Sequence, residues 1–217
     1  MNLAVFDLDN TLLAGDSDYL WGVFLVENGV VDADHYARSN ERFYREYEAG
    51  TLDIHAYGAF VLQPLVEHEL HVMQELRKRF IDERVVPMVA PGAPALLERH
   101  RRAGDTLLIT TATNRFVVEP IAALLGVPHL LATEPEIVDG RYTGRLQGTP
   151  NFQTGKVARL RAWLDEQRKP RGRITAYSDS HNDLPLLEMA DRAVAVDPDP
   201  RLRAAAQERG WDVISLR

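Results

Sequence analysis

The sequence contains no cysteine. Disulfide bonds, thiol catalysis and metal sites with cysteine ligands are therefore excluded. The absence of cysteine also fits a reducing compartment. The chain has no excess of positive charge either: 25 Lys and Arg stand against 32 Asp and Glu, which gives a formal net charge of -7. At this charge, non-specific binding to nucleic acid or to a membrane surface is not expected.

Long hydrophobic runs are also missing. No apolar stretch approaches the length of a membrane-spanning helix, and the first residues enter a strand without the basic and apolar regions of a secretion signal. We therefore expect a cytoplasmic protein. With 45% hydrophobic and 26% charged residues, the composition is that of an ordinary globular protein. A chain of 217 residues can form one full core and a smaller second unit.

The first pattern that suggests chemistry lies at the start of the chain. The apolar run 3–6 predicts a short buried strand, and Asp7 and Asp9 follow it. Residues two apart on an extended backbone face the same way, so the two carboxylates lie side by side. Since two such charges cannot both stay ionised cheaply, either one is protonated or a cation such as Mg²⁺ lies between them. A solvated turn is the alternative interpretation.

The next seventy residues read as helices without a convincing strand. Asp16 or Ser17 is placed to cap the first of them, and Gly50 to end the second. This pattern predicts a helical insert over residues 15–86. The expected helices cover 19–26, 34–49, 54–66 and 69–84.

From residue 87 onward, short apolar strands alternate with amphipathic helices. Such alternation predicts a parallel sheet covered by helices on both faces, a doubly wound α/β fold. Asp139-Gly140 adds a hairpin signal. The expected strands cover 106–110, 129–133, 174–177, 193–196 and 213–214, and the expected helices cover 93–103, 117–125, 154–167, 184–190 and 201–209.

Polar groups follow the expected strands at the edge where such sheets bind ligands. Besides the first two carboxylates, they are the stretch 110–113, Lys156 near a helix start, and the acidic stretch 178–183. Together they supply carboxylates, a hydroxyl, backbone N–H groups and one amine. This set suits a phosphoryl group held beside Mg²⁺.

These four motifs, in this order and spacing, resemble the haloacid dehalogenase (HAD) superfamily of aspartate-nucleophile phosphatases. The insert resembles the C1 cap of the phosphoserine-phosphatase-like subgroup, subfamily IB. The resemblance implies a Rossmann-like core over 1–14 and 87–217 and a small all-helical cap over 15–86. Dehalogenase chemistry is not expected, because in this superfamily it goes without the second Asp, which is present here as Asp9.

The resemblance also implies roles for individual residues. Asp7 is expected to be the nucleophile that forms an aspartyl-phosphate, and Asp9 the general acid and base. Asp7, the Asp9 carbonyl and Asp179 are the expected Mg²⁺ ligands, with Asp183 in support. The expected phosphate-binding groups are the Thr111 hydroxyl, the Ala112 N–H, Lys156 and the Asn182 amide.

The choice of phosphate ester rests mainly on Asp16. It stands where phosphoserine phosphatases carry a Glu that holds the substrate ammonium, although helix capping explains an Asp there equally well. The subgroup's basic stretch for a substrate carboxylate has no equivalent, and Arg42 and Arg45 are the candidates to replace it. A site that has an acidic side chain but no matching basic side chain favours a substrate that carries an amine and no carboxylate.

Histidinol phosphate, an intermediate of histidine biosynthesis, is the leading substrate. Some bacterial members that resemble this chain around residues 16–19 are assigned as histidinol phosphatases. Phosphocholine and phosphoethanolamine fit the same charge pattern. The alternatives are a phosphoserine phosphatase, a broad-specificity metabolite phosphatase and, from another class, a catalytically weak phosphate-binding regulatory module.

Several further residues have two interpretations. Arg115 either faces the site or only starts a helix. His181 is expected to fill its loop rather than to contact substrate. His68 and His71 are expected on a solvated helix face, since no third metal ligand is near. The aromatic set Tyr36, Phe43, Tyr44 and Tyr47 is expected to pack the cap rather than to form a substrate cage.

Overall fold

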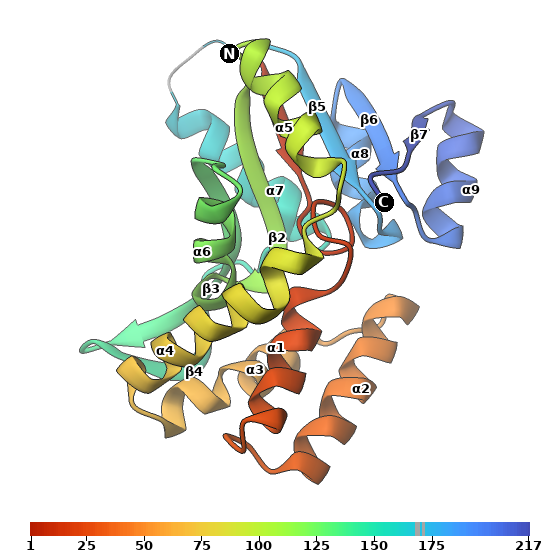
Figure 1. The fold of residues 1–217 in the computed structure, drawn as a ribbon. Coiled ribbons are helices and arrows are strands. Elements are labelled where there is room, and N and C mark those ends of the chain that lie inside the picture. The colour runs from red at the N-terminus through yellow and green to blue at the C-terminus, as the bar shows by residue number, and fades with distance from the viewer. Residues whose placement is uncertain (168–169, 171) are drawn as a thin grey trace.

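The computed structural model describes residues 1–167, 170 and 172–217. Within this part of the chain, one seven-stranded sheet has the order β4-β3-β2-β1-β5-β6-β7 (Figure 1). All neighbouring strands run parallel except β3 and β4. The strands are β1 (Leu3–Phe6), β2 (Thr106–Asn114), β3 (His129–Val138), β4 (Arg141–Gln147), β5 (Ile174–Ser178), β6 (Arg192–Val196) and β7 (Asp212–Ile214).

The α-helices agree with the ranges expected from the sequence, apart from small shifts at their ends and an early end of α4. They are α1 (Ser17–Glu27), α2 (Ala33–Ala49), α3 (Ile54–Glu67), α4 (Leu70–Phe80), α5 (Ala93–Arg102), α6 (Arg115–Leu124), α7 (Thr154–Glu166), α8 (Leu184–Met189) and α9 (Pro200–Arg209). The prediction of a doubly wound α/β core with a helical insert is therefore confirmed.

Strand β1 is apolar throughout, so both faces of the sheet need a cover at this strand, and helices provide it. Side chains alternate across a strand. Phe6 accordingly belongs to the hydrophobic cluster that includes Leu97 of α5 and Ile121 of α6, whereas Val5 belongs to the cluster with Leu160 of α7 and Leu202 of α9. All four residues of β1 are buried. The first strand thus lies at the centre of the sheet, with β2 and β5 as its neighbours.

The order of the strands reverses at β1, because β2 and β3 follow on one side and β5, β6 and β7 on the other. Register pairs Phe6 with Ile109 of β2 and with Tyr177 of β5. The ends of these three strands therefore meet at one edge, which is the crevice where open α/β sheets bind ligands.

Helices α1 to α4 lie together beyond this edge (Figure 1). The segments that enter and leave them are paired: the Ala14 N–H donates to the Met88 carbonyl at 2.7 Å, and the Ala90 N–H donates to the Leu12 carbonyl at 2.9 Å. Leu13 and Val89 form an antiparallel bridge between them. The helical group is thus attached to the sheet domain through two chain segments that are hydrogen-bonded to each other.

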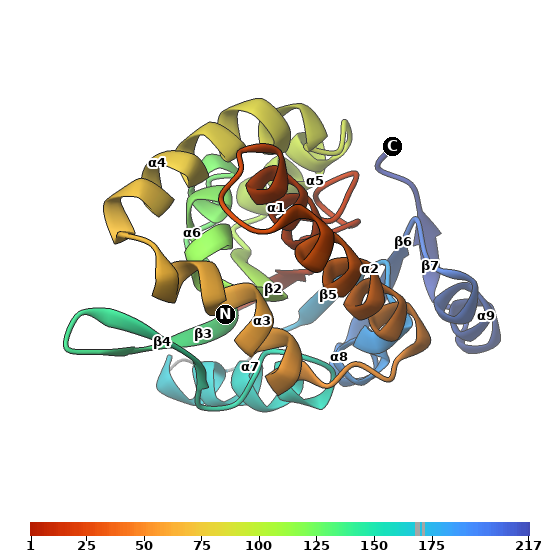
Figure 2. The same cartoon turned by 90° about the horizontal axis from the view of Figure 1, so that it is seen from below.

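The hairpin of β3 and β4 is longer than the sequence pattern indicated, and it packs against α3 (Figure 2). A Cβ added at Gly58 of α3 would lie 2.7 Å from Leu146 of β4. The absence of a side chain at Gly58 thus allows α3 and β4 to pack closely. The predicted helix over 69–84 also ends earlier than expected, since α4 stops at Phe80 and a π-helical turn, Ile81–Val85, follows. Pro87 lacks an N–H and cannot continue the helical hydrogen bonds.

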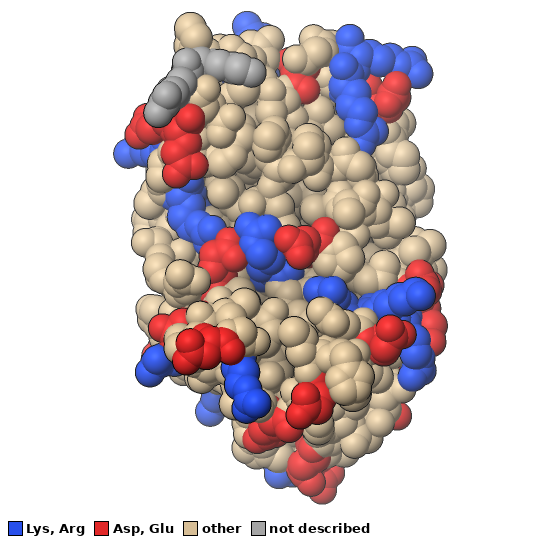
Figure 3. All heavy atoms as spheres, turned by 90° about the vertical axis from the view of Figure 1, so that its left-hand side faces the viewer, with Lys and Arg blue, Asp and Glu red and all other residues tan. Residues whose placement is uncertain are grey.

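The face over α6, β3, β4 and α7 carries acidic and basic side chains in alternation (Figure 3). Glu134 of β3 pairs with Arg115 of α6 at 2.8 Å and with Arg159 of α7 at 3.0 Å. These pairs join the two helices to the hairpin. Within the described residues, no helix combines the length and the apolar character that crossing a membrane requires.

Candidate active site

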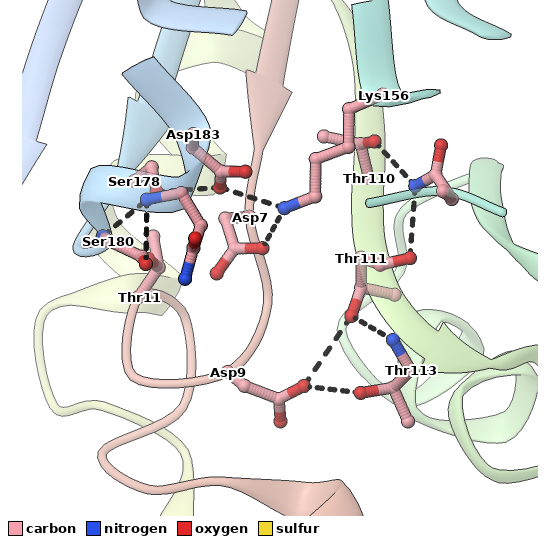
Figure 4. A network of polar contacts seen from close by, with 12 residues as sticks. Asp7, Asp9, Thr11, Thr110, Thr111, Thr113, Lys156, Ser178, Ser180 and Asp183 are labelled. Atoms are coloured by element: carbon pink, nitrogen blue, oxygen red, sulfur yellow. Dashed lines mark hydrogen bonds and ion pairs between the residues drawn. The ribbon is translucent and has the colours of Figure 1, made fainter. Parts of the chain in front are cut away.

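The centre of the site is a buried chain of three charged side chains (Figure 4). Lys156 of α7 places its Nζ 2.7 Å from Oδ1 of Asp7 and 2.7 Å from Oδ2 of Asp183. Ser178 donates a further 2.7 Å hydrogen bond to the same Asp183 oxygen. The Asp7 N–H donates to the Tyr177 carbonyl at 2.9 Å, which continues the pairing of β1 with β5. Three residues predicted for the site therefore meet.

The charges of this chain depend on one another. Burial raises the pKa of Asp7 to about 7, and the Lys156 ammonium opposes the shift. Burial by itself would lower the pKa of Lys156, but Asp183 and Asp7 outweigh it and raise that pKa above its usual range. Lys156 is therefore a permanent cation, and it offers positive charge beside the Asp7 carboxylate.

Asp9 lies opposite β2, and its carboxylate accepts several hydrogen bonds. The Ser17 N–H donates to its Oδ1 at 2.7 Å, and the Thr113 hydroxyl donates to its Oδ2 at 2.8 Å. Burial, followed by the nearby Asp16 carboxylate, raises the pKa of Asp9 to about 6. A carboxyl group with such a pKa can both give and take a proton near neutral pH.

Asp179 follows β5 and accepts a 3.0 Å hydrogen bond from the Thr11 hydroxyl at its Oδ1. Burial, and then the charges of Asp7 and Asp183, raise the pKa of Asp179 well above its ordinary value. The described residues contain no cluster of three His, Cys, Asp or Glu side chains arranged around one metal position. Mg²⁺ usually binds only one or two carboxylates and keeps waters, so the oxygen donors of this edge fit that ion.

Thr111 and Ala112 line the same cavity as Asp7, Asp9 and Lys156. The Thr111 hydroxyl accepts from the Thr113 N–H at 3.2 Å and lies 3.5 Å from Asp9 Oδ2 (Figure 4).

Asn151, which the sequence analysis did not identify, supports this loop. Its fully buried amide donates to the Thr110 hydroxyl and to the Thr111 carbonyl, both at 2.9 Å. No spacing in the sequence distinguishes this Asn from an ordinary loop residue, because the partners of its amide lie between 20 and 41 positions earlier.

The helical side of the cavity is acidic and aromatic. Asp16 caps α1, and its Oδ1 accepts from the Asp18 and Tyr19 N–H groups, both at 2.9 Å. Asp16 also lines the cavity. The structure thus shows the capping role, and binding of a substrate ammonium stays a prediction. Of the aromatic set, Tyr36 packs against Phe60 with ring centroids 4.4 Å apart, and Phe43, Tyr44 and Tyr47 also line the cavity. Cap packing over a substrate cage stays a prediction for these three.

Other residues predicted for the site do not line the main cavity. The Asn182 amide donates to the Tyr47 carbonyl at 3.1 Å and accepts from Gln153 at 3.1 Å, so it joins the sheet domain to α2. Asn182 and Asp179 line a neighbouring hollow rather than the main cavity. His181 pairs with Asp199 at 2.8 Å.

The basic candidates also point to structural roles. Arg115 starts α6 and pairs with Glu134. Arg42 and Arg45 lie on the exposed surface of α2, where they pair with Glu46 at 3.6 Å and Glu41 at 3.2 Å. Neither lines the cavity. His68 at the end of α3 bonds the Val30 carbonyl at 3.0 Å.

Comparison with known proteins gives the class of this protein. The model of the haloacid dehalogenase-like hydrolase family (HAD) matches residues 4–188, so the chain belongs to this family. Among its relatives, a histidinol-phosphatase of Neisseria meningitidis serogroup C is 41% identical over 220 residues, with 100% of this chain and 99% of that protein aligned. Phosphoserine phosphatase SerB1 of Mycobacterium tuberculosis is 33% identical over 217 residues, which are 99% of this chain and 70% of that protein.

Solved structures agree with this class. A protein of unknown function from Bordetella pertussis Tohama I matches with a TM-score of 0.94 at 42% identity, over 100% of this chain and 99% of its own. A substrate-bound phosphoserine phosphatase matches with a TM-score of 0.70 at 18% identity, over 99% and 92% of the two chains, and thus shares the fold. The family, the fold class and the enzyme class predicted from the sequence are confirmed.

Proposed function

We propose that this protein hydrolyses a small phosphate monoester through a covalent aspartyl-phosphate on Asp7. The observation that carries the proposal is the buried Asp7–Lys156–Asp183 chain at the end of β1, with Asp9 two residues further on. A carboxylate nucleophile splits one very slow hydrolysis into two displacements. Lys156 and the Thr111 hydroxyl neutralise charge on the phosphoryl oxygens.

In the first displacement, a carboxylate oxygen of Asp7 attacks phosphorus and the bond from phosphorus to the ester oxygen breaks. Asp9 gives its proton to the departing alkoxide. In the second, Asp9 takes a proton from a water molecule, whose oxygen attacks the same phosphorus, and inorganic phosphate leaves as Asp7 is regenerated. The pKa of Asp9, raised to about 6 by burial and by the Asp16 charge, suits both transfers.

We also propose that Mg²⁺ is the cofactor. Asp7, the Asp9 carbonyl and Asp179 would hold it, with Asp183 in support. When bound, the ion supplies positive charge that neutralises the phosphoryl oxygens. The two buried carboxylates Asp7 and Asp179, each with a raised pKa, support a cation at this edge.

The helical group over residues 15–86 acts, in this proposal, as a cap that closes over the site. Its side of the cavity selects the substrate. Asp16 and Asp18 contribute acid there, Tyr44 and Tyr47 contribute aromatic surface, and the only cationic side chain among the described lining residues is Lys156 at the phosphate end. These groups favour a substrate that carries phosphate at one end and positive charge at the other.

Histidinol phosphate, with its ammonium and imidazole, is the substrate that fits best. The outward position of Arg42 and Arg45 argues against a substrate carboxylate, and the relative from N. meningitidis carries the name histidinol-phosphatase. Phosphoserine hydrolysis is the second candidate, since SerB1 is 33% identical. Asp7 and Asp9 are both present, which argues against a catalytically weak phosphate-binding regulator.

The test is phosphate release with Mg²⁺ from histidinol phosphate, phosphoserine, phosphocholine, phosphoethanolamine and p-nitrophenyl phosphate. EDTA-treated enzyme and the Asp7→Asn variant are the blanks, and added Mg²⁺ should restore the first but not the second. We expect histidinol phosphate to lead in kcat/KM by about 100-fold, or ~2.7 kcal/mol. Rates within about tenfold of one another would favour a broad-specificity enzyme. A folded protein without activity on any ester would favour the regulatory module.

A further inference from the structure

Asp18 is a buried carboxylate in the cavity that the proposed chemistry leaves without a role. It is the second residue of α1, only 8% of its surface is exposed, and it lines the same cavity as Asp7 and Lys156. The Tyr57 hydroxyl of α3 donates to its Oδ2 at 2.8 Å. Among the described residues its Oδ1 has no hydrogen-bond partner, although it is fully buried.

Burial of such a group costs free energy. An ionised carboxylate has about four lone-pair sites, and its burial is unfavourable unless they are satisfied. The positive end of the α1 dipole offsets part of the cost, since Asp18 lies in the first turn. The hydrogen bond from Tyr57 that links α3 to α1 uses only one oxygen of Asp18, and the side-chain amide of an Asn could accept the same bond. The second oxygen, Oδ1, therefore remains without a partner among the described residues.

The neighbourhood of Asp18 suits a cationic or N–H donor ligand. Tyr57 packs edge-on against Phe43 with ring centroids 5.3 Å apart, and Tyr19 lies 5.3 Å from Tyr44. These four rings line the cavity together with Asp18. Aromatic faces and a carboxylate both attract positive charge. Tyr57 holds the carboxylate in place and is a positioning residue.

Asp16 and Asp18 have different neighbours. Asp16 is the N-cap next to the phosphate end, where the following Ser17 N–H bonds Asp9. Asp18 is bonded to α3, inside the helical group. A substrate with its phosphate at Asp7 therefore meets Asp16 first and Asp18 further along.

We propose that Asp18, held by Tyr57, binds the cationic or N–H-bearing ring of the substrate, while Asp16 binds the ammonium nearer the phosphate. The inference rests on the proposed function and deepens it. It makes the enzyme selective for a phosphate ester with two separate nitrogen groups. Histidinol phosphate has both, and alaninol phosphate has the ammonium alone.

The experiment compares kcat/KM for histidinol phosphate, alaninol phosphate and p-nitrophenyl phosphate in wild type, Asp18→Asn and Asp16→Asn. Loss of a charge-assisted hydrogen bond should lower kcat/KM for histidinol phosphate by roughly 10- to 100-fold in Asp18→Asn, mainly through KM. The other two esters should change by less than about threefold in that variant. Asp16→Asn should impair both amine esters.

Asp32→Asn is the matched control, because Asp32 is an exposed N-cap of α2 and Asn caps helices equally well. It should leave all three rates unchanged. Tyr57→Phe should raise KM for histidinol phosphate alone, by less than Asp18→Asn does. Equal losses on all three esters in Asp18→Asn, or no loss on histidinol phosphate, would overturn the inference and leave Asp18 as a structural link.

Calorimetry with histidinol, the dephosphorylated product, separates this inference from the proposed chemistry. Wild type should bind histidinol more tightly than alaninol, and Asp18→Asn should remove the difference. This result is independent of turnover. Hydrolysis of histidinol phosphate with no preference for histidinol over alaninol would refute the Asp18 subsite while the proposed function stands. Histidinol binding without any ester hydrolysis would refute the function and leave the subsite in place.

Discussion

Lys156 donates a 2.7 Å hydrogen bond to Asp7, a residue 149 positions earlier in the chain. The same ammonium bonds Asp183 at 2.7 Å, and all three side chains are buried. One cation thus compensates two carboxylates that would otherwise repel each other without solvent to screen them. The residue that we expect to bind phosphate therefore also stabilises the folded site.

Lys156→Met should destabilise the protein strongly. Removing one partner of a buried ion pair leaves uncompensated charge and typically costs ~3–5 kcal/mol. Urea unfolding at pH 7 measures the free energy of unfolding, and phosphate release measures activity. Lys78→Met, on the exposed surface of α4, is the matched control and should change stability by less than about 0.5 kcal/mol. A similar small effect for both variants would contradict this account of Lys156.

Asp9→Asn should slow turnover by about 10²- to 10⁴-fold, the usual contribution of a general acid and base. If Asp7 is the nucleophile, the variant should accumulate the aspartyl-phosphate with an ester whose leaving group needs no proton. Mass spectrometry after rapid quenching of the reaction with p-nitrophenyl phosphate would detect one added phosphoryl group on the peptide that contains Asp7. Asp7→Asn should show none. An unmodified peptide in both variants would speak for direct attack by water.

Asp18→Asn should stabilise the ligand-free protein, and more so at higher pH. Burial, and then the Asp16 charge, raise the pKa of Asp18 to about 8 from 3.8. Because the folded state holds the Asp18 proton more tightly than the unfolded state, the contribution of Asp18 to stability is fully present below pH 3.8. It is lost as the pH rises from 3.8 toward 8. The neutral Asn avoids that loss. We expect a gain of ~2–4 kcal/mol near pH 8 that shrinks toward pH 4.

Urea unfolding of both proteins between pH 4 and pH 8 measures this difference. The Asp32→Asn variant again serves as the control, since Asp32 is exposed and should show no such trend. A difference between Asp18→Asn and wild type that does not change with pH would mean that Asp18 is not a buried acid with a raised pKa. Together with the kinetic result, a positive outcome would show stability exchanged for substrate recognition.

Arg201→Ala should weaken closure without changing selectivity. Arg201 of α9 donates to the Ala49 carbonyl at 3.2 Å, and Asn182 donates to the Tyr47 carbonyl at 3.1 Å, so both connect the sheet domain to the end of α2. One such hydrogen bond is worth ~0.5–1.5 kcal/mol, so KM should rise roughly 2- to 10-fold for every ester alike. Arg203→Ala on the same helix is the control. A loss confined to amine esters would instead assign Arg201 to recognition.

Much of the site could be predicted because its chemistry is written in local patterns. Asp7 follows an apolar strand, Thr111 lies in the last part of the strand that becomes its neighbour, and Lys156 and Asp183 lie at the starts of helices after later strands. In a doubly wound sheet these ends meet at one edge whatever the exact packing. Composition, the alternation of strands with helices and the motif spacing were therefore sufficient for the family and the fold class, and they indicated that these residues would lie close together.

Which side chains face the cavity and which face a neighbouring element was decided only by tertiary packing. Periodicity identifies the apolar face of α2, but it does not tell whether Phe43 and Tyr47 meet another helix or a substrate cavity. The Asn182 amide bonds a carbonyl 135 residues away, and Asn151 holds β2 from a distant loop. Such partners depend on how elements dock, because side-chain geometry at a contact is fixed by both surfaces together. The sequence alone thus determined which polar side chains meet at the strand ends, and the folded structure decided what surrounds them.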